Sequence, residues 1–562
     1  MVRHYLLQLY KKEFNSLHEA AFLLGSFALL SQVIAVVRDR LFASMGAGLE
    51  LDVYYASFRI PDMIFVAIAS FVALTVILPF FIEKLNTNKE QARDFINSIF
   101  TLFFFVIIII SIVVFFAVPY LVEMFFAGFT IGARDEVILL TRILLLSPIL
   151  LGISNLFASI TQTFRNFFVY ALSPVLYNLG IILGLLFLYP NMGIIGLGFG
   201  VVLGAGLHML IQVPVIIAYG FFPRFSFKMK MSASEIKKIL ILALPRTIGL
   251  SAQQIVLFVL ISTAAGMAVG SIAVFQLSLN LQSVPLSIIG VSYSVAAFPT
   301  LARLYSKNKT TQFIEQVLTA TRHIIFWSIP IAALFLVLRA QIVRVIFGTG
   351  KFDWDDTQLT AASFAIFSLS VVAQSLILLF VRSFYAAGKT MIPVVVNILC
   401  SGFIIVFVFV MHNFFFTNTF FRDFIEVLLR VENVPGSNIL SLSIAYSVGM
   451  FINVFILWWL FKRVFHIGPC AQIQKTLRHS LYSSVIMGFV AYHLLDIFDN
   501  IFNIETFWGI FFQGLFAGLG GIVMGVLLLV VIRNDEIKEI LKAIRGKFWK
   551  TKTIIPDKDD LL

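Results

Sequence analysis

The sequence predicts an all-α polytopic membrane protein, and three observations support that fold class. Of 562 residues, 60% are hydrophobic and only 12% are charged, whereas a soluble domain carries about 25% charged residues. Apolar windows of about 20 residues, the length that crosses a hydrocarbon core about 30 Å thick, recur along the whole chain. These windows are continuously apolar and lack the alternation typical of membrane β-barrels. Lipid, and not water, is therefore the expected solvent for most of the surface.

About fourteen transmembrane helices are expected from these windows. Before the first of them, residues 1–18 mix apolar and basic side chains, which is typical of a short helix at the membrane surface, and no small-residue cleavage site follows. The fourteen helices are predicted near residues 19–44, 52–82, 96–127, 137–163, 170–189, 192–220, 239–265, 269–302, 317–346, 358–386, 391–412, 439–461, 477–497 and 507–532.

The net charge of +12 is concentrated in alternate loops. Lys and Arg are frequent in 84–93, 224–238, 303–309 and 462–478 and in the tail 534–562. The other loops are poor in them and contain chiefly Arg134, Arg339, Arg344, Lys351, Arg422 and Arg430. By the positive-inside rule, the first set faces the cytoplasm, so both termini are expected inside. This placement accounts for the positive charge without a nucleic-acid partner.

An internal repeat predicts two lobes. Residues 79–96 and 299–315 each begin with a Pro that ends an apolar span, followed by a Lys/Asn-rich loop and an amphipathic restart. The offset of about 220 residues corresponds to six helices, so the two copies have the same orientation. We therefore expect two parallel-repeat six-helix lobes around a central cavity. Their predicted ranges are 19–220 and 221–466, with an outer-loop insertion at 413–438, followed by an appended helix pair in 467–533 and the basic tail.

Arg38, Asp39 and Arg40 lie together at the end of the first apolar window. Ionisable residues inside a membrane are costly, and they normally face a bundle interior or a wet cavity that serves a transported solute. The cluster therefore favours a transporter with a polar or charged substrate. The alternative is that both arginines extend to the membrane interface.

Three further charged residues have two interpretations each. Arg59 precedes Ile60-Pro61, so it is either a substrate contact or a donor to carbonyls freed by the proline kink. Asp52 is either a helix N-cap or a functional acid. Arg246, beside a proline, is either a carbonyl clamp or part of a gate.

No motif indicates an enzyme. The sequence contains no His/Cys cluster with metal-ligand spacing, no nucleophile elbow and no Walker loop. Cys400 and Cys470, the only two cysteines, indicate no disulfide framework. We therefore expect no catalysis, no cofactor and no metal ion.

Several stretches together carry a family resemblance. The segment VVRDRLFASMGAGLELDVYYASFRIPD resembles the first two helices of the MurJ (MviN) lipid II flippases, members of the multidrug/oligosaccharidyl-lipid/polysaccharide exporter superfamily. From about residue 20 to 400, further similar stretches follow in the expected order: TQTFRNFFVYALSPVLYN, LALPRTIGLSAQQI, SVAAFPTLARLYS, VIFGTGKFDWDDTQLTAASFAI and RSFYAAGKTMIPV.

The resemblance implies export of a lipid-linked peptidoglycan precursor. This is an undecaprenyl diphosphate that carries a disaccharide-pentapeptide, moved from the inner to the outer leaflet by alternating access. The implied partners are membrane lipid, this glycolipid and proteins of cell-wall synthesis, and the last helix pair is implied to form a groove for the lipid tail.

The resemblance also assigns Arg38, Asp39, Asp52 and Arg59 to charged positions of the family, while Arg40 and Arg246 are candidates from the sequence itself. Arginine suits a diphosphate because its planar fork holds phosphate oxygens bidentately. The residues expected to bind substrate are Arg38, Asp39, Arg40 and Arg59. Those expected to act as gating or structural charges are Asp52 and Arg246.

Five positions depart from the family pattern. Phe65 and Val66 occupy the positions of an arginine pair, Ser70 that of a glutamate, and Asn280 and Gln32 those of two further basic residues. Three functions therefore stay open. They are a lipid II flippase, an exporter of another polyprenyl-linked glycan or of an amphipathic solute, and a non-transporting membrane scaffold.

Overall fold

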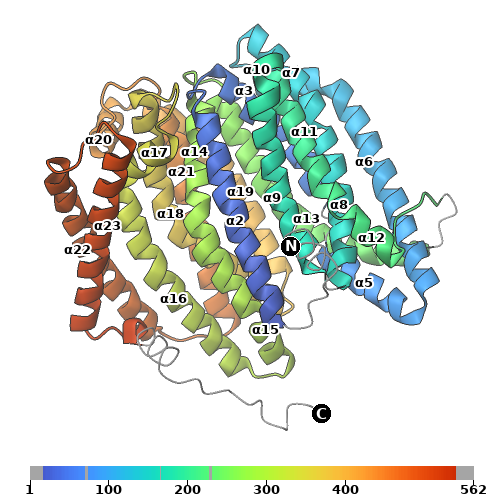
Figure 1. Cartoon of the computed structure of the whole chain (residues 1–562). Helices are drawn as coiled ribbons and strands as arrows, with labels where there is room; N and C mark the ends of the chain where they lie inside the picture. Colours follow the sequence, from blue (N-terminus) through green and yellow to red (C-terminus); the bar gives the residue numbers. More distant parts are fainter. Residues whose placement is uncertain (1–16, 70–73, 165, 227–230, 539–562) are drawn as a thin grey trace, which may run out of the picture. The chain divides into compact units, whose positions relative to one another are not determined.

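The computed structural model describes residues 17–69, 74–164, 166–226 and 231–538 (Figure 1). Every regular element in these ranges is a helix, which confirms the all-α prediction. The chain divides into two compact units, of which the first comprises Met1–Val284, Ile346–Phe367 and Gly388–Ile456. The second comprises Pro285–Val345, Ser368–Ala387 and Leu457–Leu562. The predicted surface segment before residue 17 and the tail after residue 538 lie outside the described residues.

The first unit holds most of the helices. It contains α2 (Leu17–Ala43), α3 (Leu49–Ser57), α4 (Arg59–Ala69), α5 (Leu74–Thr87), α6 (Lys89–Phe125), α7 (Ile131–Leu144), α8 (Leu146–Thr163), α9 (Phe167–Leu183), η1 (Gly184–Leu188), α10 (Tyr189–Met192), α11 (Ile194–Leu210), α12 (Val213–Tyr219), α13 (Ala233–Ala264), α14 (Ser271–Pro285), α19 (Met391–Thr417) and α20 (Thr419–Leu429).

The second unit holds the C-terminal helix pair. It contains η2 (Leu286–Val291), α15 (Ser292–Ser306), α16 (Thr310–Val337), most of α17 (Arg339–Phe347), α22 (Ala471–Asp499) and α23 (Phe507–Val531). Two further helices begin in the first unit and end in the second, α18 (Trp354–Ala386) and α21 (Ile439–Val464).

Twelve helices among the described residues are long and apolar enough to cross a membrane. They coincide with the third to the fourteenth of the predicted helices. The first predicted helix, 19–44, corresponds to α2, and the second, 52–82, to α3, α4 and α5. The polytopic helical class is therefore confirmed, whereas the lobe boundaries stay predictions.

Proline residues account for breaks that the apolar windows did not indicate. The predicted second helix is interrupted at Phe58, three residues before Pro61, whose ring cannot donate a backbone hydrogen bond. The predicted helix 269–302 contains a π-helical turn, η2, which begins directly after Pro285. Such turns insert an extra residue into the helical ladder and locally change which side chains share a face.

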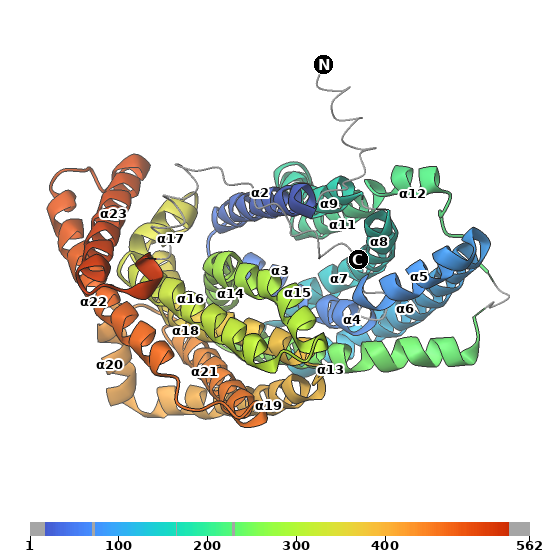
Figure 2. The same cartoon turned by 90° about the horizontal axis from the view of Figure 1, so that it is seen from below.

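Glycines allow α9 and α11 to approach closely. A Cβ atom on Gly180 would lie 2.3 Å from the Gly204 Cα, and one on Gly184 would lie 2.2 Å from the Gly200 Cα. Membrane helices commonly associate through such small residues, because no hydrophobic force drives them together in lipid. The glycine-rich stretch after residue 192 therefore permits close packing of α11 against α9. Helices α2, α9 and α11 consequently lie side by side (Figure 2).

In the second unit, α22 and α23 pack on each other, and α22 also packs on α16 (Figure 2). Leu334, Met487 and Ala491 form one buried apolar cluster between α16 and α22. A Cβ on Gly521 of α23 would lie 2.8 Å from the Met487 carbonyl oxygen, so this glycine brings the helix pair into backbone contact.

The insertion at 413–438 contains the amphipathic helix α20. Asn418 caps it by accepting a hydrogen bond from the Phe421 backbone N–H at 3.0 Å. The side chains of Phe420, Phe424 and Leu428, spaced four residues apart, are all exposed. That this apolar face rests on the membrane surface stays a prediction.

The packing of α9 against α11 predicts that Gly204→Ala is destabilising. The added methyl group would meet the Tyr177 carbonyl oxygen at 2.4 Å, a backbone atom that cannot move without the helix. We expect a loss of about 1–3 kcal/mol, typical of overpacking, seen as a lower thermal unfolding temperature of the purified protein. Gly206→Ala is the matched control, because nothing lies within 4 Å of its Cβ position. Equal stability of the two variants would contradict the packing assignment.

Candidate functional site

A cavity of about 300 Å³ lies within the first unit, between α2, α9 and α14. Polar side chains from all three helices line it, together with Ile346 and Phe347 from the end of α17. The polar residues of its wall are Ser31, Gln32, Arg38, Asp39, Tyr177, Asn178, Asn280 and Ser283. A polar cavity within long apolar helices is the setting in which a membrane protein handles a hydrophilic group.

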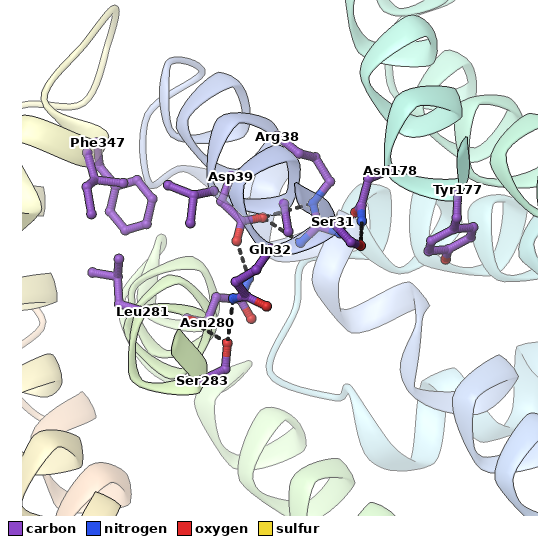
Figure 3. A pocket seen from close by; sticks show the side chains of 13 residues that line it. Ser31, Gln32, Arg38, Asp39, Tyr177, Asn178, Asn280, Leu281, Ser283 and Phe347 are labelled. Carbon is purple, nitrogen blue, oxygen red and sulfur yellow. Dashed lines mark hydrogen bonds and ion pairs between the residues drawn. The ribbon is translucent and has the colours of Figure 1, made fainter. Parts of the chain in front are cut away.

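Arg38 and Asp39 form an ion pair in this cavity (Figure 3). The Arg38 Nε and Nη2 atoms donate to Asp39 Oδ1 at 2.9 and 2.7 Å. The Arg38 side chain is 21% exposed and that of Asp39 is 8% exposed. The aspartate is therefore a buried anchor, and the guanidinium is the charged group presented to the cavity.

Asn178 of α9 holds the other edge of the guanidinium. Its Oδ1 atom accepts a hydrogen bond from Arg38 Nη1 at 2.8 Å. Its Nδ2 atom donates to Ser31 Oγ at 3.3 Å and to the Pro174 carbonyl at 3.1 Å. That carbonyl lies four residues earlier on α9, so the amide orientation is set by its own helix. Arg38 is thus fixed from two helices.

Asn280 of α14 holds the second oxygen of Asp39. Its Nδ2 atom donates to Asp39 Oδ2 at 3.0 Å, while its Oδ1 atom accepts from Gln276 Nε2 at 2.8 Å. A further link joins Gln32 Nε2 to Ser283 Oγ at 3.4 Å. Asn280 and Gln32 are two of the positions at which the family resemblance implies a basic residue, and both face this cavity as neutral amides.

The arrangement can bind an anionic group. A guanidinium has five N–H donors, and Arg38 donates three hydrogen bonds to Asp39 and Asn178. Within the described ranges, the other two N–H groups have no acceptor and remain for an oxyanion. Amide and hydroxyl groups that can hydrogen-bond a sugar or peptide surround them. The charges of Arg38 and Asp39 balance, so the wall itself has little net charge.

A second cavity, of about 330 Å³, lies between α4, α8, α9 and α11 of the same unit. Its polar lining consists of Asp62, Ser147, Asn155, Tyr177 and His208. Ser154 Oγ lies 2.7 Å from His208 Nδ1 and also donates to the His208 carbonyl at 3.1 Å, which holds this imidazole against α8. Tyr177 lines both cavities.

Arg40 and Arg59 do not line the first cavity. Arg40 Nη1 donates to the Ile346 carbonyl at 3.0 Å. Arg59 Nε donates to the Tyr55 carbonyl at 3.3 Å, and its Nη2 atom lies 3.8 Å from Asp62 Oδ2. The contact of Arg59 with a carbonyl just before the proline break agrees with its structural interpretation. The backbone of Arg246 belongs to α13, but its side chain lies outside the described residues.

Asp52 caps a helix other than its own. Its Oδ2 atom accepts from the Gly270 N–H at 2.6 Å, and its Oδ1 atom accepts from the Ala273 N–H at 2.8 Å. A carboxylate at this position compensates the unpaired N–H groups and the positive end of the α14 dipole. Gly270 has φ +91°, and a Cβ there would meet the Ala47 carbonyl oxygen at 1.9 Å. The cap therefore joins the α2–α3 turn tightly to α14.

Several residues of the site are not predicted from the sequence. Asn178 and Tyr177 lie in the stretch SPVLYN, which carries the family resemblance but no predicted site residue, and neither Ser31 nor Ser283 is a predicted site residue. Asp62, which follows Pro61 directly, is not predicted either. A signal existed for Asn178 and Asp62, because each is a strongly polar side chain within an apolar span.

Comparison with known proteins identifies the family. Residues 42–512 match the family described as lipid II flippase MurJ. A probable lipid II flippase MurJ of Treponema pallidum (strain Nichols) is 22% identical over 95% of this chain and 99% of that protein. A probable lipid II flippase MurJ of Buchnera aphidicola subsp. Schizaphis graminum is 25% identical over 77% of this chain and 81% of its own length.

Solved structures share the fold. A structure titled "Lipid II flippase MurJ, inward closed conformation" matches with a TM-score of 0.71 and 21% identity, covering 92% of this chain and all of that one. An inward-facing multidrug resistance MATE family transporter of the MOP superfamily matches with a TM-score of 0.62 and 15% identity, covering 79% of this chain and 96% of that one. Since the family match extends over most of its length, the chain belongs to the lipid II flippase MurJ family.

Proposed function

We propose that this protein is a lipid II flippase. It moves an undecaprenyl-diphosphate-linked disaccharide-pentapeptide from the inner to the outer leaflet of a bacterial cytoplasmic membrane, and both termini lie in the cytoplasm. Family membership and the names of the relatives support the substrate class. The observation that carries the proposal is the Arg38–Asp39 pair inside a polar cavity of about 300 Å³ between apolar helices.

The substrate chemistry explains why such a site is needed. A diphosphate with a sugar-peptide head cannot enter hydrocarbon unaided, because removing its hydration costs many kcal/mol. The two remaining N–H groups of Arg38 replace part of the hydration of one phosphate. The polar groups of Asn178, Asn280 and Ser283 replace water around the glycan, while the polyprenyl chain stays in lipid.

Alternating access requires contacts that open at one end of the cavity at a time. With both termini inside, the α2–α3 turn lies on the outer side, where Asp52 caps α14. Two further hydrogen bonds support closure there: Asp356 Oδ2 accepts from the Ala47 N–H at 3.0 Å, and the Lys351 N–H donates to the Ser44 carbonyl at 2.9 Å. Release of the head to the outer leaflet requires these contacts to separate.

On the inner side, one ion pair joins the first predicted lobe to the second. Lys84 Nζ of α5 donates to Glu235 Oε1 of α13 at 2.5 Å. This hydrogen bond lowers the pKa of Glu235, to which the N-terminal capping interaction with Ser232 also contributes. The ion pair is therefore present above the ordinary carboxyl pKa of about 4.3 and is lost as the pH falls through the lowered pKa of Glu235. At neutral pH the ion pair is fully formed.

An exporter of another polyprenyl-linked glycan is the second candidate. Asn280 supports it, because a neutral amide occupies a position at which the family resemblance implies a cation. The positive and negative charges of the cavity wall balance. Such a wall suits a substrate with fewer negative charges than a diphosphate.

Replacement of the charged pair is expected to abolish transport. In a strain depleted of its lipid II flippase, the parent protein restores growth, whereas Arg38→Ala and Asp39→Ala do not, at equal protein levels in the membrane. Arg38→Ala removes the hydrogen-bond donor to the anion. Asp39→Ala leaves a guanidinium without its counter-ion, which lowers the free energy of unfolding by about 3–5 kcal/mol. Growth restored by both variants would refute the proposal. Failure of the parent itself, with the protein present in the membrane, would favour the second candidate.

Asn280→Arg is expected to retain transport, and Asn280→Leu is expected to reduce it. The arginine can still donate to Asp39 Oδ2 and adds a cation to the wall, whereas leucine leaves that buried oxygen without its donor. Complementation of the same depleted strain, with protein levels matched, measures both variants. If leucine were tolerated better than arginine, the assigned role of Asn280 would be wrong.

Reversal of one partner of the inner ion pair is expected to open the inner side. Glu235→Lys places two cations together, so a thiol reagent added from the cytoplasm should label Ser283→Cys in the first cavity faster. The double exchange Lys84→Glu with Glu235→Lys re-forms the pair and should restore the slow rate. Unchanged labelling in the single variant would exclude this ion pair as a gate contact.

A further inference from the structure

The second cavity contains a carboxylate that its surroundings leave poorly satisfied. Asp62 lies near the start of α4, within the second predicted transmembrane helix, 52–82. Its side chain is nevertheless 40% exposed, and it lines the cavity. An ionisable side chain within a membrane segment indicates a functional site.

Arg59 compensates this charge only in part. Among the described residues it is the one ion-pair partner of Asp62, and no hydrogen bond reaches the carboxylate from any of them. The closest separation is 3.8 Å, against about 2.7–2.9 Å for a charge-assisted hydrogen bond. Arg59 is itself buried, donates to Tyr55 and does not line the cavity. One side of the carboxylate therefore faces the cavity and can accept a hydrogen bond from a ligand.

The rest of the wall selects the chemistry of that ligand. Aromatic and aliphatic side chains predominate, including Phe58, Phe65, Leu144 and Leu151. An aromatic wall favours a cation, and an apolar wall favours a methylene chain. An anion is disfavoured by Asp62. A divalent metal ion, which prefers about six or more oxygen ligands, is a poor match for a lining with a single carboxylate.

We propose that the second cavity is a binding subsite for an alkylammonium group, with Asp62 as its counter-ion. The proposal rests on the proposed function for the identity of the group, which is the free amine of a side chain in the peptide of the transported glycolipid. The cavity is adjacent to the first one, since Tyr177 lines both. The head group of one glycolipid molecule therefore places its diphosphate at Arg38 and its amine at Asp62. Phe65, at a family arginine position, allows this because it adds no further cation to the wall.

The test compares two substrates in vesicles that contain the full-length protein. One is lipid II whose peptide carries a lysine, and the other is the same molecule with the lysine Nε atom acetylated. A hydrolase added outside the vesicles measures how fast the head becomes accessible. The wild-type protein is expected to transport the lysine form with a half-saturating concentration about tenfold lower, the scale of one partly desolvated cation contact.

Asp62→Asn is expected to remove this preference by weakening transport of the lysine form alone, and Asp62→Glu is expected to keep it. Asp423→Asn on α20 is the matched control, because Asp423 is exposed and, in the part of the chain that the structure describes, forms its ion pair with Arg422, at 3.6 Å. Equal use of both substrates by the wild-type protein would overturn the assignment of the peptide amine. An equal loss for both substrates in Asp62→Asn would mean that Asp62 serves only as the partner of Arg59.

A binding measurement separates this proposal from the proposed function. n-Hexylammonium is expected to raise the thermal unfolding temperature of the wild-type protein and not that of Asp62→Asn, while hexanol has little effect on either. If lipid II is not transported but n-hexylammonium binds, the subsite stands and its ligand is a free cationic amphiphile. If n-hexylammonium stabilises neither protein more than hexanol does, the subsite is refuted whatever the outcome for lipid II.

Discussion

The pairing of Arg38 with Asp39 is the interaction on which the candidate site depends. A lone guanidinium among apolar helices would be expensive, and a lone carboxylate equally so. Their pairing lowers that cost, yet it leaves three N–H groups of Arg38 for other partners, and one of these donates to Asn178. Neighbouring residues on a helix do not normally face each other, so the long arginine side chain must turn back along α2. Asn178 makes that turn persistent by holding the opposite edge of the guanidinium.

The surrounding packing keeps these partners at hydrogen-bonding distance. The glycines of α11 bring its backbone against α9, whose Asn178 contacts Arg38. On the opposite side, Asp52 caps α14, which carries Asn280 to the second oxygen of Asp39. Small residues and a helix cap thus determine where two amides lie, and the amides determine the orientation of the ion pair. The chemistry of the cavity is set largely by residues that do not touch it.

Much of the fold was predictable from the sequence, because long apolar windows have few stable alternatives in lipid. The importance of Arg38 and Asp39 was predictable for the same reason, since charge in such a window requires compensation. Their partners were not predictable, because Asn178 and Asn280 lie 140 and 241 residues away from the groups that they contact. Asp52 shows a different limit of prediction from the sequence. Its position near a helix start made a local cap one of two interpretations, but its carboxylate reaches the N-terminus of α14 instead, a contact that only tertiary structure determines.

Proline explains two of the differences along the chain. Hydropathy does not distinguish a continuous helix from one broken near Pro61 or followed by a π-turn after Pro285. The first break puts Arg59 beside a backbone carbonyl and Asp62 beside a cavity, so the same short motif supplies both a structural and an exposed charge.

Tyr177 and Asn178 are successive residues of α9, about 100° apart around its axis. Tyr177 lines both cavities, and the Asn178 amide accepts a hydrogen bond from the Arg38 guanidinium. Rotation of α9 about its axis would displace both side chains together. A substrate group that displaced Tyr177 in one cavity would therefore act on the same helix that orients the cationic group of the other.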